Sequence, residues 1–366
     1  KKKKIKRKKI WKQARKIIKK KKDKLIIKDN KKLYEIQEPI GVVALIIPWN
    51  FPMIVLSERL PYILAAGNTV IIKPSENGTL SIDYFIKIIE NSNLPNGTVN
   101  YLTGDYKTGK YLVENKNISM ISFTGSTKTG KEIYRNASTT LKRLSLELGG
   151  KNPMAVLSDA NLNKACDEVI YSFTHNAGQC CVSGSRLFVE KNISFKFIEI
   201  IKKKLIKLDL KQSITTINQY IKIKKIIIKA IKNKVRIIYR NKKLFDDKKR
   251  IIYPIIFDIK NKIDYLDEEI FGPVLTVKSF QDVDTLINDM NDTNYGLSAL
   301  IWTKNNKKGL YIASKIKSGR IWINGDISQN YPEIAIGGFK ESGINRETGE
   351  SGLRTYSEIK SIIVNN

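Results

Sequence analysis

The sequence predicts an α/β protein with two open parallel-sheet domains and a small β ribbon. Between Gly41 and Gly150, short continuous apolar runs alternate with helical stretches, which is typical of parallel strands covered by helices on both faces. A second stretch of the same kind runs from about 151 to 340. The chain has 366 residues, of which 42% are hydrophobic, so it is long enough and apolar enough for two cores.

The first 37 residues predict a helix followed by a hairpin. Residues 1–22 are rich in lysine, and their apolar residues recur at helical spacing, so we expect one basic amphipathic helix. Residues 24–37 hold two short apolar runs on either side of Asp29-Asn30, a pair that favours turns, and this pattern predicts a β-hairpin.

The alternating segment predicts four strands with helices between them. The helices are expected at about 53–66, 79–90 and 127–138, and the strands at Val42–Ile47, Thr69–Ile72, Val99–Leu102 and Ile118–Phe123. Sheets of this kind bind ligands at the carboxyl ends of their strands.

The second stretch is less informative. Its middle, 191–250, is rich in lysine and isoleucine, and within it Ile221–Lys234 predicts an amphipathic helix. Ser357–Val364 predicts a closing strand.

The composition limits the possible partners. There are 66 basic and 35 acidic residues, giving a net charge of +31, which points either to a polyanion partner or to compositional drift. We favour drift, without a specific nucleic-acid role, because no nucleic-acid-binding motif accompanies the charge.

The three cysteines include an adjacent pair, which argues against a disulfide framework and for a reducing compartment such as the cytoplasm. We expect no membrane span, because no apolar run approaches ~18–20 residues.

Four segments carry residue types suited to covalent catalysis. Cys180-Cys181 lies in a Gly/Ser-rich turn, where an exposed thiolate can act as a nucleophile. Pro48-Trp49-Asn50-Phe51-Pro52 follows a predicted strand, and the Asn50 amide is suited to a developing oxyanion. Glu147, at the end of another strand and just before Leu148-Gly149-Gly150-Lys151, is a candidate general base. The fourth segment is Glu268-Glu269-Ile270-Phe271-Gly272-Pro273.

With these segments, in this order, the chain resembles the aldehyde dehydrogenase superfamily from about Ile10 to the C-terminus. Further matching motifs are Phe123-Thr124-Gly125-Ser126-Thr127, Asn294-Tyr295-Gly296-Leu297 and Gly337-Gly338-Phe339-Lys340-Glu341-Ser342-Gly343. The resemblance implies two Rossmann-like open-sheet domains and a β oligomerisation ribbon, in a homodimer or homotetramer. It divides the chain into a cofactor domain (1–23 and 38–147), a ribbon (24–37 with 353–366) and a catalytic domain (148–352).

The resemblance also implies a role for each matching residue. Cys181 matches the nucleophile and Cys180 its non-catalytic neighbour. Glu147 matches the general base, and Asn50, with the Cys181 N–H, matches the oxyanion hole. His175 occupies a position that either lines the aldehyde pocket or packs structurally. The positions that match cofactor-binding residues are Trp49, Lys73, Glu76, Gly125, Ser126, Glu269 and Phe271.

The implied reaction is oxidation of an aldehyde to a carboxylic acid by the hydrolytic branch of the family, through a thiohemiacetal and a thioester on cysteine. NAD is the expected cofactor, with NADP left open, and no metal is expected. Only 47 residues precede Pro48, fewer than is usual in the family, so we expect an N-terminally truncated or divergent member. The alternatives are a catalytically impaired scaffold or oligomerising remnant of this fold, or a sequence-independent polyanion binder. No set of residues identifies the aldehyde.

Overall fold

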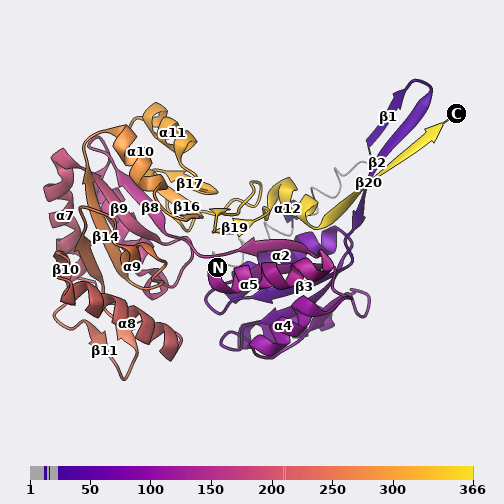
Figure 1. Ribbon diagram of the computed structural model, residues 1–366, viewed down its shortest axis with the longest axis horizontal. Helices are drawn as coiled ribbons and strands as arrows, with labels where there is room; N and C mark the ends of the chain where they lie inside the picture. Colours follow the sequence, from indigo (N-terminus) through magenta and orange to yellow (C-terminus); the bar gives the residue numbers. More distant parts are fainter. Residues whose placement is uncertain (1–11, 15, 17–23, 209, 211, 366) are drawn as a thin grey trace. The chain divides into compact units, whose positions relative to one another are not determined.

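The chain folds into two compact units, each with its own open sheet (Figure 1). The computed structural model describes residues 12–14, 16, 24–208, 210 and 212–365, so the predicted basic helix over 1–23 lies almost entirely outside the described residues. Unit 1 contains the described residues up to Glu147, Tyr331–Gly337 and those from Gly343 on, and unit 2 contains Leu148–Asn330 and Gly338–Ser342.

The sheet of unit 1 confirms the expected parallel arrangement. Its strand order is β19-β7-β6-β3-β4-β5, in which β19 pairs antiparallel with β7 and the other neighbours are parallel. The strands are β3 (Val42–Ile47), β4 (Thr69–Pro74), β5 (Val99–Tyr101), β6 (Met120–Thr124), β7 (Arg143–Glu147) and β19 (Gly343–Ile344).

Helices cover the sheet of unit 1 because their apolar residues recur on one face. Leu56, Leu60 and Ile63 of α2 and Ile82 of α3 pack in one core with the buried residues of β3 and β4. The helices are α2 (Pro52–Ala65), α3 (Leu80–Glu90), α4 (Tyr106–Glu114), α5 (Thr127–Ala137) and α12 (Gly349–Thr355), with a 3₁₀ turn, η1 (Ser138–Thr140). Three match the predicted helices within two residues at either end, whereas α4 was not predicted.

A three-stranded antiparallel ribbon extends from unit 1 (Figure 1). It is formed by β1 (Lys24–Lys28), β2 (Lys31–Pro39) and β20 (Ser357–Asn365), with β2 in the middle. Asp29 and Asn30 both have positive φ, 50° and 60°, as a two-residue hairpin turn requires. The start of the region predicted as ribbon, 353–355, belongs instead to α12.

Unit 2 is a second α/β layer structure, with strand order β10-β13-β14-β9-β8-β16-β17. Its strands are parallel except β10, which pairs antiparallel with β13. Alternate residues of β8 pack into the cores on opposite faces of the sheet. Met154 packs with α6 and α7, and Ala155 packs with α10 and α11. The strands of this sheet are β8 (Asn152–Val156), β9 (Gly184–Glu190), β10 (Ile237–Arg240), β13 (Ile255–Asp258), β14 (Val274–Phe280), β16 (Ser298–Trp302) and β17 (Arg320–Ile323).

The remaining elements of unit 2 are helices and two small antiparallel pairs. The helices are α6 (Leu162–Thr174), η2 (His175–Gly178), α7 (Lys191–Ile206), α8 (Ile217–Lys232), α9 (Asp264–Asp267), α10 (Val283–Asn291) and α11 (Asn306–Lys315). The pairs are β11 (Phe245–Asp246) with β12 (Ile251–Ile252), and β15 (Tyr295–Gly296) with β18 (Phe339–Lys340). Across the part of the chain that the structure describes, no helix is long and apolar enough to cross a membrane.

The boundary between the units differs from the predicted one near the C-terminus. Residues 331–337 and 343–352 were assigned to the catalytic domain, but they belong to unit 1. The physical reason is strand pairing, because Gly343 and Ile344 extend the sheet of unit 1 alongside β7. Local sequence patterns do not show that this late segment of the chain joins the sheet of unit 1.

Candidate active site

The segment with the two adjacent cysteines forms a tight loop after α6. Asn176, Ala177 and Gly178 all have positive φ, between 52° and 73°. A Cβ on Gly178 would lie 2.3 Å from the carbonyl carbon of Gly272, so the two backbones pack directly against each other. This contact explains the glycine at position 178, and it brings the cysteine loop and the Glu268–Pro273 loop together within unit 2.

The two cysteines differ in exposure. Cys180 is buried, with 8% of its surface exposed, whereas Cys181 is partly exposed. The Asn152 side chain donates to the Cys181 carbonyl at 2.7 Å and to the Ser183 carbonyl at 2.8 Å, which holds the backbone at Cys181 and just after it. A hydrogen bond with the Cys181 side chain lowers the pKa of the Cys180 thiol against the effect of burial. Of the two residues, Cys181 is therefore the more accessible.

The Glu269–Phe271 segment is held by α8. The Gln219 side chain donates to the carbonyls of Ile270 at 2.8 Å and Phe271 at 3.3 Å, and Lys222 donates to the Glu269 carbonyl at 3.2 Å. Phe271 has a φ of 57°, a left-handed conformation that is costly for a bulky residue. The two bonds from Gln219 stabilise this conformation.

The Glu269 carboxylate points into unit 2, where its Oε1 accepts from the Gly150 N–H at 3.0 Å. Burial raises its pKa, and the bond from Gly150 and the Lys222 and Lys151 charges oppose that rise. The Lys151 ammonium is itself buried without a hydrogen-bond partner, and burial lowers its pKa to about 7. Of these residues, Glu269 and Gly150 line a cavity of about 20 Å³, room for about one water molecule. It is lined by Gly150, Phe173, Gly178, Cys180, Ser183, Gly184, Ser185, Glu269, Ile270, Phe271, Gly272 and Val274.

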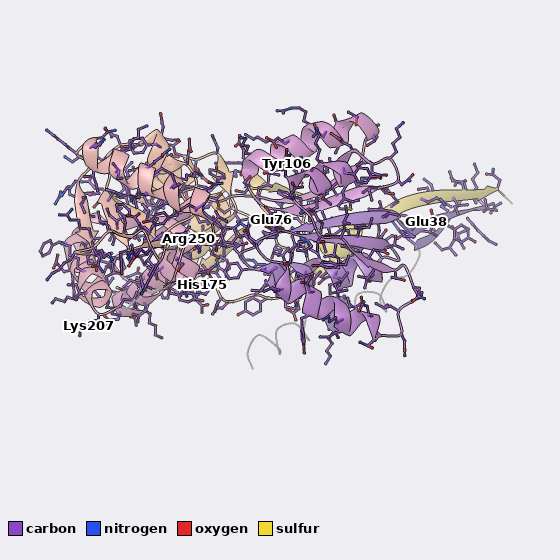
Figure 2. The ribbon with its side chains drawn as sticks, turned by 90° about the horizontal axis from the view of Figure 1, so that it is seen from below. Glu38, Glu76, Tyr106, His175, Lys207 and Arg250 are labelled. Carbon is purple, nitrogen blue, oxygen red and sulfur yellow. The ribbon has the colours of Figure 1, made fainter. Side chains whose placement is uncertain are left out.

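His175 lies where α6 ends (Figure 2). Its ring tilts against the ring of Tyr171, one turn earlier, with 4.8 Å between centroids. Both are partly exposed, so this end of α6 presents aromatic surface to solvent.

In unit 1, Trp49 and Asn50 follow β3 at its carboxyl end. The neighbouring turn packs closely against them, because a Cβ on Gly78 would lie 2.9 Å from Trp49 Cα. The Ser75 N–H donates to the Ile47 carbonyl at 2.8 Å and ties this turn to the end of β3. Asn50 and the Lys73–Glu76 segment thus lie at one end of the sheet.

Lys73 is the last residue but one of β4, and its side chain is buried. Its Nζ donates to the Pro74 carbonyl at 3.0 Å, and burial lowers its pKa against the opposing charges of Glu76 and Asp105. Glu76 is exposed in the turn that follows (Figure 2).

Gly125 and Ser126 form the turn from β6 into α5. A Cβ on Gly125 would lie 2.3 Å from the ring of Phe123, so only glycine fits there. Ser126 caps α5 by accepting from the Thr129 N–H at 3.2 Å. The Thr124 hydroxyl just before the turn is buried without a hydrogen-bond partner. At this helix N-terminus a ligand can approach the backbone closely, and a hydroxyl lacks a hydrogen-bond partner. Both features suit a phosphate-containing ligand.

Glu147 is the last residue of β7, and its carbonyl accepts from the Gly125 N–H at 3.1 Å. Its carboxylate oxygen Oε1 is buried without a hydrogen-bond partner. Burial raises the pKa of Glu147 to about 8, with the Arg59 charge as the main opposing effect. A carboxyl group with a pKa close to neutral is suited to general acid–base work.

A buried polar network beside Glu147 was missed by the sequence analysis. Arg59 of α2 and Glu347 are both buried, with 3.4 Å between Arg59 Nε and Glu347 Oε1. Glu347 also accepts from the Tyr356 hydroxyl at 3.0 Å and from the Ser145 hydroxyl. An arginine on the apolar face of a helix was the one available signal, since a charge at such a position requires a partner.

The structure assigns the predicted site residues to two units. Cys181, His175, Glu269 and Phe271 belong to unit 2, whereas Asn50, Trp49, Lys73, Glu76, Gly125, Ser126 and Glu147 belong to unit 1. Lys73 and Glu147 lie near the carboxyl ends of β4 and β7, and the others lie in segments that follow strands or helices. Lys222 lies in the helix predicted at Ile221–Lys234, and Gln219 lies just before that range, in the first turn of α8. Neither was recognised as a site residue, because their contacts span 47 to 52 residues.

Comparison with known proteins places the chain among characterised sequences and structures. Residues 7–362 match the model of the aldehyde dehydrogenase family. An NAD(P)+ aldehyde dehydrogenase of Saccharomyces cerevisiae is 38% identical over 353 residues, covering 92% of this chain and 70% of the relative. Betaine aldehyde dehydrogenase of Bacillus subtilis is 36% identical over 344 residues, covering 90% of this chain and 70% of the relative.

Solved structures agree with these matches. The NAD+ complex of an aldehyde dehydrogenase from Bacillus cereus has a TM-score of 0.93 and 32% identity, covering 98% of this chain and 75% of that one. An NAD-dependent aldehyde dehydrogenase from Sinorhizobium meliloti has a TM-score of 0.92 and 33% identity, covering 97% and 73%. The two-sheet fold with its ribbon is therefore the fold of these proteins.

Proposed function

Since the chain belongs to the aldehyde dehydrogenase family, we propose that it oxidises an aldehyde to a carboxylic acid with NAD as the hydride acceptor. The assignment of the nucleophile rests on the difference in exposure between the two adjacent cysteines. Cys181 is accessible, on a backbone fixed by Asn152, and Cys180 is buried. A nucleophile must reach its substrate, so Cys181 is the residue that fits.

The chemistry then follows from three side chains. The Cys181 thiolate attacks the aldehyde carbon and forms a thiohemiacetal. The Asn50 amide and the Cys181 N–H stabilise the oxyanion of this intermediate. Loss of hydride from its carbon leaves a thioester. Glu147 removes a proton from water, and the resulting hydroxide attacks the thioester carbon. Collapse of this adduct releases the acid and expels the Cys181 thiolate.

NAD supplies the hydride acceptor when bound, and this chain's residues orient it. We assign the pyrophosphate to the N-terminus of α5 at Gly125 and Ser126, beside the unsatisfied Thr124 hydroxyl. The adenosine ribose is assigned to Lys73 and Glu76. Trp49 contributes from the turn after β3.

The nicotinamide end is assigned to Glu269 and Phe271. Glu269 Oε1 accepts from the Gly150 N–H in this structure, and the second oxygen of the carboxylate can accept from a ribose hydroxyl. We place His175 in the aldehyde pocket, on the strength of the partly exposed aromatic pair that it forms with Tyr171.

We also propose assembly through the ribbon into a homodimer or homotetramer. Ile27, Ile359 and Ile363 of the ribbon are 71%, 59% and 65% exposed, an apolar surface that pairing between subunits would cover. The three free cysteines favour a reducing compartment, and we propose the cytoplasm.

The test is formation of NADH, followed by its near-ultraviolet absorbance, with a panel of aldehydes. Cys181→Ser should abolish turnover and the sensitivity to iodoacetamide, whereas Cys180→Ser should keep most of the activity. If Cys180→Ser is the inactive variant, the assignment of the nucleophile is wrong. If the parent chain oxidises no aldehyde while it still binds NAD, the catalytically impaired scaffold replaces the enzyme as the better interpretation.

A further inference from the structure

The carboxyl ends of β4 and β5 lie side by side in unit 1. Ile72 pairs with Tyr101, and the Leu102 N–H donates to the Ile72 carbonyl at 3.0 Å. Lys73 follows Ile72 on one strand, and Gly104-Asp105 follows Leu102 after the other. Figure 2 shows Glu76 and Tyr106, the neighbour of Asp105, at this end of the sheet.

The positive charge at this edge is held away from solvent. Lys73 is only 4% exposed, and its Nζ is bound to the Pro74 carbonyl. The stem of Lys73 is covered by α4, since a Cβ on Gly109 would lie 3.9 Å from its Cδ and Cε. The carboxylates of Glu76 and Asp105 both act on this ammonium. The ammonium is therefore held by a backbone carbonyl and lies within the electrostatic influence of two carboxylates.

Asp105 is fixed by the start of α4. Its side chain caps the helix by accepting from the Lys107 N–H at 2.9 Å. The residue before it, Gly104, has a φ of 146°, and a Cβ there would lie 2.1 Å from the Thr108 hydroxyl oxygen. The turn is thus too tight for any other residue at Gly104, and it sets where the Asp105 carboxylate stands. Asp105 itself is exposed, so its charge faces a ligand arriving from solvent.

We propose that Asp105 is a second cofactor-specificity residue, which acts with Glu76 to favour an adenosine ribose with a free 2′-hydroxyl over one with a 2′-phosphate. The inference rests on the proposed use of NAD and extends it to a residue outside the matching motifs. A ribose hydroxyl can donate to either carboxylate, whereas a 2′-phosphate would meet two anions and one cation that is already engaged. The exposed Lys107 opposes this repulsion, but salt screens its charge.

The test uses fragments without nicotinamide, so that it is independent of turnover. ADP-ribose and 2′-phospho-ADP-ribose are titrated calorimetrically into the full chain at ~0.15 M salt. Asp105→Asn removes the charge and keeps the helix cap, because asparagine caps as well as aspartate. Glu114→Gln is the matched control, since this exposed carboxylate pairs with Lys110 at the far end of the same helix. Glu76→Gln is the positive comparison.

We expect Asp105→Asn to tighten binding of 2′-phospho-ADP-ribose about tenfold, the order expected for removing one charge near a protein surface. Binding of ADP-ribose should change less than about twofold, and Glu114→Gln should affect neither ligand. An unchanged ratio of the two affinities in Asp105→Asn overturns the proposal. An equal effect of Glu114→Gln also overturns it, because only net charge would then matter. If the parent chain binds neither fragment, the cofactor site itself is wrong, a failure distinct from the other two.

Discussion

Replacing Glu147 by glutamine should separate the two halves of the reaction. The amide keeps the shape of the side chain but cannot accept the proton of the attacking water. Cys181 can still form the thioester, so rapid mixing of Glu147→Gln with NAD and aldehyde should give a burst of NADH, equivalent to one turnover per active site. Acid release should then be slower than in the parent by about 10²–10⁴-fold, the usual contribution of a general base.

The pH dependence of the parent follows from the burial of Glu147. Its pKa is raised to about 8, so about one tenth of the carboxyl groups are ionised at pH 7 and about nine tenths at pH 9. Only the ionised form accepts a proton, so the steady rate should rise about tenfold between these pH values when deacylation limits turnover. The variant has no titrating group at this position, and its slow phase should lack this rise.

The assay is stopped-flow absorbance of NADH from pH 6 to 9.5, with burst and steady phases fitted separately. Glu350→Gln, the same change on an exposed carboxylate of α12, is the control and should behave as the parent. Parent-like turnover in Glu147→Gln would remove Glu147 from the mechanism. A rate in the parent that is flat from pH 7 to 9, with deacylation still limiting, would refute the argument that burial controls this base.

Three further predictions address the cofactor loop, assembly and charge. Gln219→Ala removes two hydrogen bonds to the Glu269–Phe271 segment, so it should raise KM for NAD about tenfold. It should also lower the free energy of unfolding by about 1–3 kcal/mol. The control is Asn218→Ala, at an exposed position. An unchanged KM would show that Gln219 does not position that segment. Light scattering at micromolar concentration should show an oligomer, and deletion of β20 should abolish it; a monomeric parent would refute assembly through the ribbon. Oligonucleotide competition at ~0.15 M salt should show no sequence preference, and a clear preference would favour the polyanion-binding alternative.

Local patterns predicted most of the strands and helices around the proposed site. The apolar run Val42–Ile47 is β3 without any shift in its ends, and the predicted strand at Thr69–Ile72 is extended by two residues in β4. Both are buried parallel strands, whose continuous apolar character is a strong local signal. The helix α4 was missed because only Leu112 and Val113 of its nine residues are buried, which leaves little periodicity to recognise.

What the sequence determined by itself was the identity of the family and the residues that match its motifs, because nucleophile, base and glycine turns each occupy a few consecutive positions. What only the tertiary structure decided was the environment that gives those residues their properties. The burial that raises the pKa of Glu147 depends on surroundings that include Arg59 and Glu347. The backbone conformation of Phe271 depends on the hydrogen bond that Gln219 donates to its carbonyl. These partners lie far apart along the chain and meet only when the units fold, since burial and charge proximity are properties of the packed structure rather than of neighbouring residues.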